Sequence, residues 1–456
     1  MNRPVLLALI LLPCPAYALQ PLPEFLESAK KHNFDNREAQ ATVRQREHQV
    51  DAAKWDMIPT VNATAAYARN QYEVKVTIPT GPTDTITRTI TPFNQLDAQL
   101  TLTQPIVDFS VFRSIDAARR NLAAGTARVA ATQKQVDQSV AQTYFQVLAA
   151  EAFIRATEEV HAATLANLNI VEKRAVAGVA SDLDRRRAEV EVERSRKTIA
   201  DAEYNLAIAR QRLRSLSGLE PEPGELEIEV ALDEEPPLKT WVATHDLPTV
   251  RAADADAVSA DAQVRSSAAL LYPTLSASAN ERFTNATGFL GRYAIASASA
   301  NLSWRFDLAI LPQLRAAKAQ ASLSRIRADR ARQTAYDEIH GAWHQVKAAL
   351  AKARSARAER DTSKVAVSQA RQRYEAGTGL FLEVTQAERD AFSAQISLIQ
   401  ADADLASARI LLRIHAGRDF KNTVKIRPAT QADRPTITPP PEPPKPPTIE
   451  APEVAR

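Results

Sequence analysis

The sequence has 456 residues, a formal net charge of +3 and a single cysteine. So small a charge, with no basic stretch interleaved with aromatic residues, argues against a nucleic-acid-binding protein. Apolar residues make up 45% of the chain, but aromatic residues only 6%, and there are 11 glycines; this composition favours long helices.

The N-terminus has the pattern of a secretory signal peptide. A short basic start is followed by the apolar run Val5–Leu12 and by the A-x-A motif Ala16-Tyr17-Ala18. This pattern predicts a signal peptide over residues 1–18, cleaved so that the mature chain begins at Leu19. The alternative is that Cys14 is the lipidated first residue of a lipoprotein. No later segment approaches the roughly 20 consecutive apolar residues of a membrane-spanning helix.

The chain carries one tract twice, 199 positions apart. Arg174, Gly178 and Asp184 correspond to Arg373, Gly377 and Glu383. The match runs without a gap over roughly 110 residues, as helices require, because one inserted residue would rotate every later side chain about the axis. The sequence therefore predicts a tandem duplication. Its parts are a first repeat over 19–218, a linker over 219–248, a second repeat over 249–418, and a proline-rich tail over 419–456 that we expect to be disordered.

Both repeats are expected to contain the same elements in the same order: a helix, a pair of strands, a very long helix, a tip and a shorter helix. In the first repeat these are about 22–55, about 60–106, 109–176, 177–181 and 182–217. In the second they are about 249–269, about 274–306, 309–376, 377–380 and 381–416.

The strand predictions rest on strict alternation of apolar and polar residues in Leu96–Thr103 and in Ala294–Phe306. The first repeat has 15 extra residues in the threonine-rich stretch Lys75–Pro92, which is expected to be a long hairpin loop. Strands of roughly ten residues suit a tilted transmembrane strand. Four strands cannot close a barrel, and lipid does not tolerate an open sheet edge. Two chains would give eight strands and three would give twelve.

The long helix is predicted from a heptad spacing, beginning with Ile115 and Leu122. At 1.5 Å per residue, 68 residues extend on the order of 100 Å, so the molecule should be elongated. Gly178 and Gly377 suit the left-handed residue that ends a helix. Ser181 and Asp184 have the spacing of a capping box.

These features together resemble the TolC-like outer-membrane efflux proteins over about residues 20–418. The resemblance rests on the duplicated R-x3-G-x4-L-[DE] tips, the Pro-Thr strand starts at Pro59 and Pro273, and Trp304-Arg305-Phe306-Asp307. It implies a mainly α protomer with a β-barrel portion, a homotrimer with a 12-stranded barrel in outer-membrane lipid, and an α-helical tunnel across the periplasm of a Gram-negative bacterium. It also implies a periplasmic adaptor and an inner-membrane pump as partners, and no catalytic residue, metal or other cofactor.

The resemblance further implies roles for residues at the tips. Asp184 and Tyr374 match gate-contact residues, and Glu383 matches a carboxylate of a constriction ring. The sequence departs from the family at Gly379, where an arginine would answer Asp184, and at Gln386, where the ring has its second carboxylate. The residues expected at the tips for adaptor docking are Arg174, Gly178, Leu183, Arg373, Gly377 and Leu382.

Other interpretations have weaker support. A periplasmic coiled-coil adaptor or scaffold would need one hairpin and an anchor, whereas this chain has two hairpins and four amphipathic strands. His340 and His344 are four residues apart but lack the glutamate of a zinc hydrolase, so a packed or exposed pair is expected. The run Asp184–Arg187 is followed by glutamates and should be a solvated helix face. No G-x-S-x-G or Walker-type loop indicates an enzyme.

Overall fold

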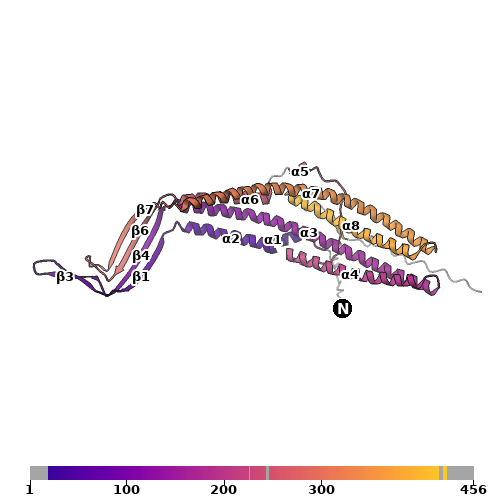
Figure 1. The fold of residues 1–456 in the computed structure, drawn as a ribbon, viewed down its shortest axis with the longest axis horizontal. Helices are drawn as coiled ribbons and strands as arrows, with labels where there is room; N and C mark the ends of the chain where they lie inside the picture. The colour runs from indigo at the N-terminus through magenta and orange to yellow at the C-terminus, as the bar shows by residue number, and fades with distance from the viewer. Residues whose placement is uncertain (1–18, 225, 243–245, 421–424, 429–456) are drawn as a thin grey trace, which may run out of the picture.

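The fold is a long layer of helices joined end-on to a small sheet (Figure 1). The computed structural model describes residues 19–224, 226–242, 246–420 and 425–428. The expected signal peptide and residues 429–456 of the expected tail lie outside these ranges. None of the helices in the described ranges is long and apolar enough to cross a membrane.

Eight helices are present in the described ranges. They are α1 (Leu22–His32), α2 (Phe34–Trp55), α3 (Phe109–Val176), α4 (Asp182–Ser217), α5 (Leu238–Val242), α6 (Pro248–Ala269), α7 (Ile310–Glu375) and α8 (Phe381–His415). The 68-residue α3 occupies the range that the heptad spacing predicted, and its N-cap Asp108 accepts hydrogen bonds from the next turn.

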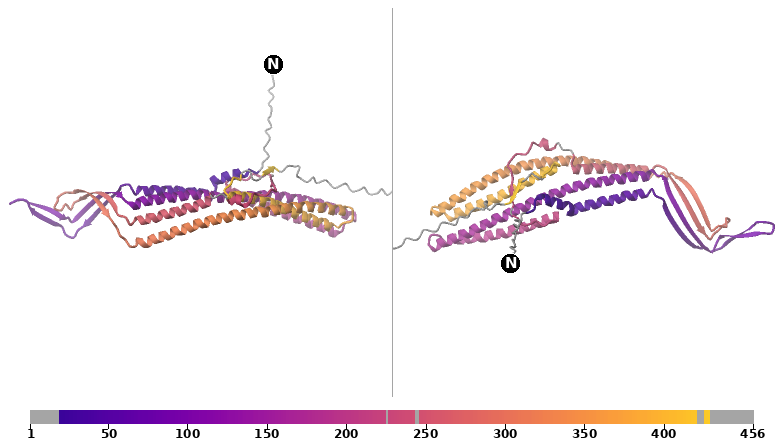
Figure 2. Two further views of the ribbon diagram at one scale, coloured as in Figure 1. Left: turned by 90° about the horizontal axis from the view of Figure 1, so that it is seen from above. Right: turned by 180° about the vertical axis from the view of Figure 1, so that it is seen from behind.

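The helices lie in four neighbouring rows. α3 packs along α2, α4, α6 and α8, and α7 packs along α6 and α8. The short helices form two end-to-end rows, α4 with α2 and α8 with α6, so the order across the layer is α4/α2, α3, α8/α6, α7 (Figures 1 and 2). At the first junction the Asn33 side chain donates a hydrogen bond to the Leu216 carbonyl (2.9 Å).

The chain at Asn33 differs from one prediction. The expected single helix over 22–55 is broken into α1 and α2, because Asn33 adopts an extended conformation and its side-chain oxygen caps α2 by accepting from the Asp35 amide (2.9 Å). The break lets α1 turn its apolar face onto α3 at the waist of the molecule. There Phe25, Tyr144 and Leu148 are fully buried with Leu405 and Leu412 of α8 in one continuous core.

The strands form three antiparallel sheets. Their bounds are β1 (Thr60–Arg69), β2 (Val74–Pro79), β3 (Thr85–Thr91), β4 (Asn94–Val107), β5 (Leu226–Glu229), β6 (Thr274–Thr284), β7 (Ala294–Ser303) and β8 (Lys425–Pro428). The main sheet has the order β1-β4-β6-β7, so the two repeats meet at the β4–β6 pair.

Register gives the main sheet one largely apolar and one polar face. Val61 pairs with Leu102, and Leu275 with Leu302, on the apolar face. On the polar face Thr101 pairs with Asn280. This is the alternation expected from the sequence.

Three segments differ from the predicted elements. The expected loop over 75–92 contains the β2–β3 hairpin, which extends beyond the main sheet (Figure 1). β7 ends at Ser303, so Trp304–Phe306 lie outside the strand. The tail expected to be disordered from residue 419 contains β8, which pairs with β5 of the linker, so that part of the prediction is wrong.

Candidate functional site

The predicted tips are two tight helical turns at the far end of the molecule from the sheet (Figure 1). Gly178 and Gly377 have φ values of +74° and +75°, a conformation that favours glycine. Val179 and Leu380 beside them are largely exposed, as are Leu183 and Leu382 in the first turns that follow. Each tip therefore leaves two large apolar side chains exposed to solvent.

Asp184 is held within its own helix. It forms the predicted capping box: its amide donates to Ser181 Oγ (3.1 Å), and the Ser181 amide donates to its carboxylate (3.4 Å). Arg187 lies 3.8 Å from the same carboxylate. These side-chain contacts all lie within α4 and its N-cap, and among the described residues of one protomer Asp184 makes no contact with Tyr374.

Tyr374 instead meets Arg174, which joins the two tips. The Arg174 guanidinium lies 4.4 Å from the centre of the Tyr374 ring and donates to the Tyr374 carbonyl (3.3 Å). The same ring packs on Phe381, with centroids 5.8 Å apart. Phe381 in turn buries Val171 and Ala188 of the first repeat. Arg174 and Tyr374 thus hold the α3/α4 hairpin against the α7/α8 hairpin.

Glu383 and Gln386 lie together on α8. Glu383 is 3.4 Å from Arg373 in an exposed ion pair, and Gln386 donates to Asp390 (2.9 Å). Both line an open groove of about 910 Å³ between α7 and α8. Its lining also includes Leu382, Ala387, Asp390, Ser355, Ala358, Glu359, Thr362, Ser363 and Ala366.

The groove contains two carboxylates that the sequence did not single out, Glu359 and Asp390. Asp390 is seven residues beyond Glu383, about two turns, and so falls on the same helix face. That spacing was readable in the sequence. Glu359 comes from α7, and no local pattern indicates that it faces α8.

Further from the tips, polar side chains link the two hairpins again. The Glu388 carboxylate accepts from Asn167 of α3 (2.8 Å) and from Arg371 of α7 (2.6 Å). Arg389 of α8 forms an ion pair with Glu191 of α4. Both links run through α8, which therefore contacts both helices of the first hairpin.

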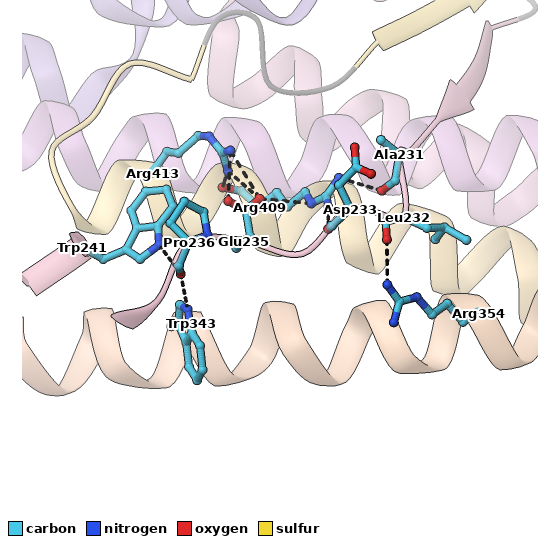
Figure 3. A network of polar contacts seen from close by, with 10 residues as sticks. All are labelled: Ala231, Leu232, Asp233, Glu235, Pro236, Trp241, Trp343, Arg354, Arg409 and Arg413. Atoms are coloured by element: carbon cyan, nitrogen blue, oxygen red, sulfur yellow. Dashed lines mark hydrogen bonds and ion pairs between the residues drawn. The ribbon is translucent and has the colours of Figure 1, made fainter. Parts of the chain in front are cut away.

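At the waist the linker crosses the outside of the second repeat as a strap, defined here as residues 230–242 (Figure 3). Arginines of α7 and α8 donate hydrogen bonds to its main-chain carbonyl groups. Arg409 donates to Ala231 and Asp233 (2.8 and 2.5 Å), and Arg354 donates to Leu232 (2.8 Å). The strap is therefore fixed to both helices of the hairpin.

Glu235 and Pro236 complete this attachment. The Glu235 carboxylate lies 3.2 Å from Arg409 and 3.3 Å from Arg413, and both Glu235 and Arg409 are about nine-tenths buried. Burial lowers the pKa of Arg409, and Glu235 opposes that shift. The indoles of Trp241 and Trp343 both donate to the Pro236 carbonyl (3.2 and 3.0 Å; Figure 3).

The first repeat has a matching arrangement. Tyr144, the counterpart of Trp343, donates to the Gln20 carbonyl (3.2 Å), so the segment beginning at Leu19 occupies the place that Pro236 occupies in the second repeat. Arg210, the counterpart of Arg409, pairs with Glu151 of α3 (2.8 Å). In the first repeat a carboxylate of the neighbouring helix α3 thus pairs with the arginine, whereas in the second repeat a carboxylate of the strap does so.

Towards the sheet, a second groove of about 620 Å³ lies across the helix layer. It is polar and lined by small side chains, and α2, α3, α6 and α7 all contribute to it. Its only ion pair among the lining residues joins Arg128 to Asp256 (2.8 Å). A groove shared by four adjacent helices indicates that the layer is concave on this side.

Comparison with known proteins gives consistent matches. The sequence is 26% identical over 290 residues to the solvent efflux pump outer membrane protein SrpC of Pseudomonas putida, covering 60% of each chain. It is 28% identical over 308 residues to protein CyaE of Bordetella pertussis, covering 65% of this chain and 64% of that one. The matched region thus spans somewhat under two thirds of the length of these curated relatives.

The fold is also that of solved channels. The Campylobacter jejuni CmeC outer membrane channel superposes with a TM-score of 0.72 at 16% identity, covering 88% of this chain and 86% of that chain. The sequence model of outer membrane efflux proteins matches residues 25–219 and 243–418, which cover nearly all of the first repeat and the whole of the second. The chain belongs to the outer membrane efflux protein family.

Proposed function

We propose that three copies of this protein form a channel-tunnel in the outer membrane of a Gram-negative bacterium, which passively conducts substrates out of a tripartite efflux or type I secretion system. The observation that carries the proposal is the two-faced sheet with unpaired edges. In the described part of the chain β1 and β7 each pair on one side only. The helix layer likewise has two edges that pack on one side only: α2 and α4 form one edge and α7 forms the other.

The sheet has the properties of a lipid-facing wall. Its apolar face is exposed in the single chain, including Val61, Leu100 and Leu302. Exposed aromatic residues lie near both ends of the strands, as in the girdles of outer-membrane barrels. At the helix end they are Trp55, Tyr272, Trp304 and Phe306, and at the far end Tyr67, Tyr72, Phe283 and Tyr293.

Three copies are the best number for pairing the open edges of the sheet around water. Two copies would give eight strands, and a barrel of that size is filled by its own side chains. Three copies give twelve strands, and the polar face then surrounds water. That face carries the Asp97–Arg282 ion pair (2.7 Å) and a ladder of serine, threonine and asparagine.

Passive conduction fits the walls of the proposed tunnel. The groove across the helix layer is lined mainly by alanine, serine and glutamine, and its one carboxylate, Asp256, is paired with Arg128. Such a surface offers little apolar area to retain a solute. We assign selection of the substrate to the inner-membrane pump, as in a channel that has no enzymatic role of its own.

The tips are the proposed gate and docking end. Glu383 and Asp390 would place two layers of carboxylates about 10 Å apart along the tunnel, and Asp390 would compensate for the missing charge at Gln386. Asp184 and Tyr374 would meet the neighbouring copy. The exposed tip residues, with Arg174, Leu183, Arg373 and Leu382, would contact the periplasmic adaptor, which connects the tunnel to the pump.

The orientation can be tested through the β2–β3 hairpin, because loop tips tolerate insertions that helices do not. An epitope inserted at Gly81 should be bound by antibody on intact cells, and the same epitope after Gly178 should be bound only when the outer membrane is broken. The opposite pattern would show that the helices point outward and would refute the proposal.

A further inference from the structure

We propose that His340 and His344 form a surface site for one divalent transition-metal ion, Cu²⁺, Ni²⁺ or Zn²⁺. The sequence predicted only a packed or exposed histidine pair. The structure shows that both side chains are exposed on α7, on the side of the helix that faces away from α6 and α8. The pair is argued from one chain alone; in the proposed trimer this edge of α7 would lie beside α2 and α4 of the next copy.

The separation of the two rings suits a shared ion. Their centroids are 4.6 Å apart, with an angle of 47° between the ring planes. An ion held by two imidazole nitrogens at about 2.0–2.1 Å, with a bond angle of about 90–110°, places the ring centroids about 4.5–5.2 Å apart. The unliganded spacing already falls within that range.

Both rings are oriented by neighbours that leave their nitrogen atoms free. Tyr336 stacks on His340 at 6.2 Å, and Trp343 meets His344 edge-on at 4.9 Å. Among the described residues neither imidazole makes a hydrogen bond or an ion pair. Trp343 is itself fixed by its bond to the strap at Pro236. Less side-chain freedom is then lost when an ion binds.

The ligand set determines the class of ion. Two imidazoles favour Cu²⁺ over Ni²⁺ and Zn²⁺, and exclude Mg²⁺ and Ca²⁺, which prefer oxygen. No group of three or more histidine, cysteine, aspartate or glutamate side chains in the described ranges is placed to hold an ion. The bound ion would therefore keep open positions for water, and its affinity would fall in acid because protons compete for the same nitrogens.

The test uses full-length protein without a polyhistidine tag, stripped of metal and titrated calorimetrically with Cu²⁺ and Ni²⁺. We expect one site per chain, and nitrogen hyperfine splitting from two imidazoles in the Cu²⁺ electron paramagnetic resonance spectrum. His340→Gln and His344→Gln should each weaken binding at least tenfold. His48→Gln, which removes an exposed histidine elsewhere, should leave binding unchanged.

A second control keeps the number of histidines constant. His344→Gln combined with Gln345→His moves one imidazole about 100° around α7, and it should weaken Cu²⁺ binding as much as His344→Gln alone. Wild-type protein that binds no ion, or a shifted pair that binds as tightly as the original, would overturn the proposal.

Discussion

Two groups of polar side chains in this protein differ in their surroundings. Glu383, Gln386 and Asp390 lie on an open groove, where in the proposed tunnel their charge would act on passing ions. Asp137 is instead largely withdrawn from solvent on α3, and one of its carboxylate oxygens has no hydrogen-bond partner among the described residues. The first group predicts effects on conduction and the second predicts effects on stability.

Replacing Glu383 tests the gate. In planar bilayers Glu383→Gln should reduce cation selectivity and weaken block by multivalent cations, because a ring of like charges attracts cations. Asp390→Asn should act in the same direction, and Gln386→Asp in the opposite one. Asp184→Ala should instead raise open probability by loosening tip contacts. Unchanged selectivity and block in Glu383→Gln would leave Glu383 as a surface partner of Arg373 only.

Asp137 predicts a dependence of stability on pH. Burial raises its pKa from the ordinary 3.8 to about 6, with Lys30 acting in the opposite direction. The unfolded chain therefore loses this proton at lower pH than the folded protein, and stability decreases as the pH rises from about 4 to about 6. Asp137→Asn should raise the thermal midpoint at pH 7.5 by an amount equivalent to about 1–3 kcal/mol, and leave it unchanged at pH 4. An equal shift at both pH values would exclude the ionisation as its cause.

At the element scale, the repeat predicted most of the fold, for a physical reason. Helix register survives only without insertions, so an ungapped match over two hairpins indicated the bounds of α3, α4, α7 and α8. The break at Asn33 was missed because its cap lies within a long polar tract. The strap was missed because Glu235 and Pro236 lie in a segment without periodicity, and their partners Arg409 and Trp343 are distant in sequence.

The strap also gives a prediction about stability. Glu235→Gln leaves Arg409 nine-tenths buried without its carboxylate, and breaking such a pair costs about 3–5 kcal/mol. We expect a lower thermal midpoint and faster proteolysis between residues 230 and 242. Glu234→Gln is the matched control: it removes a carboxylate that is 80% exposed and 3.8 Å from Arg354, worth under about 1 kcal/mol. Equal effects from both variants would contradict the role given to Glu235.

The position of the N-terminal segment bears on whether the mature chain begins at Leu19 or at a lipidated Cys14. Leu19 is 2% exposed, and Gln20 is bound to Tyr144, about 50 Å along α3 from its strand-facing end. Five residues from Cys14 to Leu19 reach at most about 18 Å, too short to connect this site to a membrane around the strands. N-terminal sequencing of the mature protein should therefore give Leu19, and a lipid-modified Cys14 would contradict the assignment.

At the scale of the whole molecule, each repeat contributes one strand pair and one helical hairpin to a layer that is open at both edges. Closure was not predictable from one chain, because in the proposed assembly the residues that meet across the edges belong to different copies. The proposed number of copies rests on the strand count and on the need to surround water rather than side chains.

We propose above that copies of this chain close into a water-filled channel. The most direct test is single-channel recording of full-length protein, purified from outer membranes as a particle with the mass of three copies and reconstituted in planar bilayers. We expect discrete, long-lived current steps that favour cations. A folded three-copy particle that inserts but carries no current, or a particle containing one copy only, would contradict it.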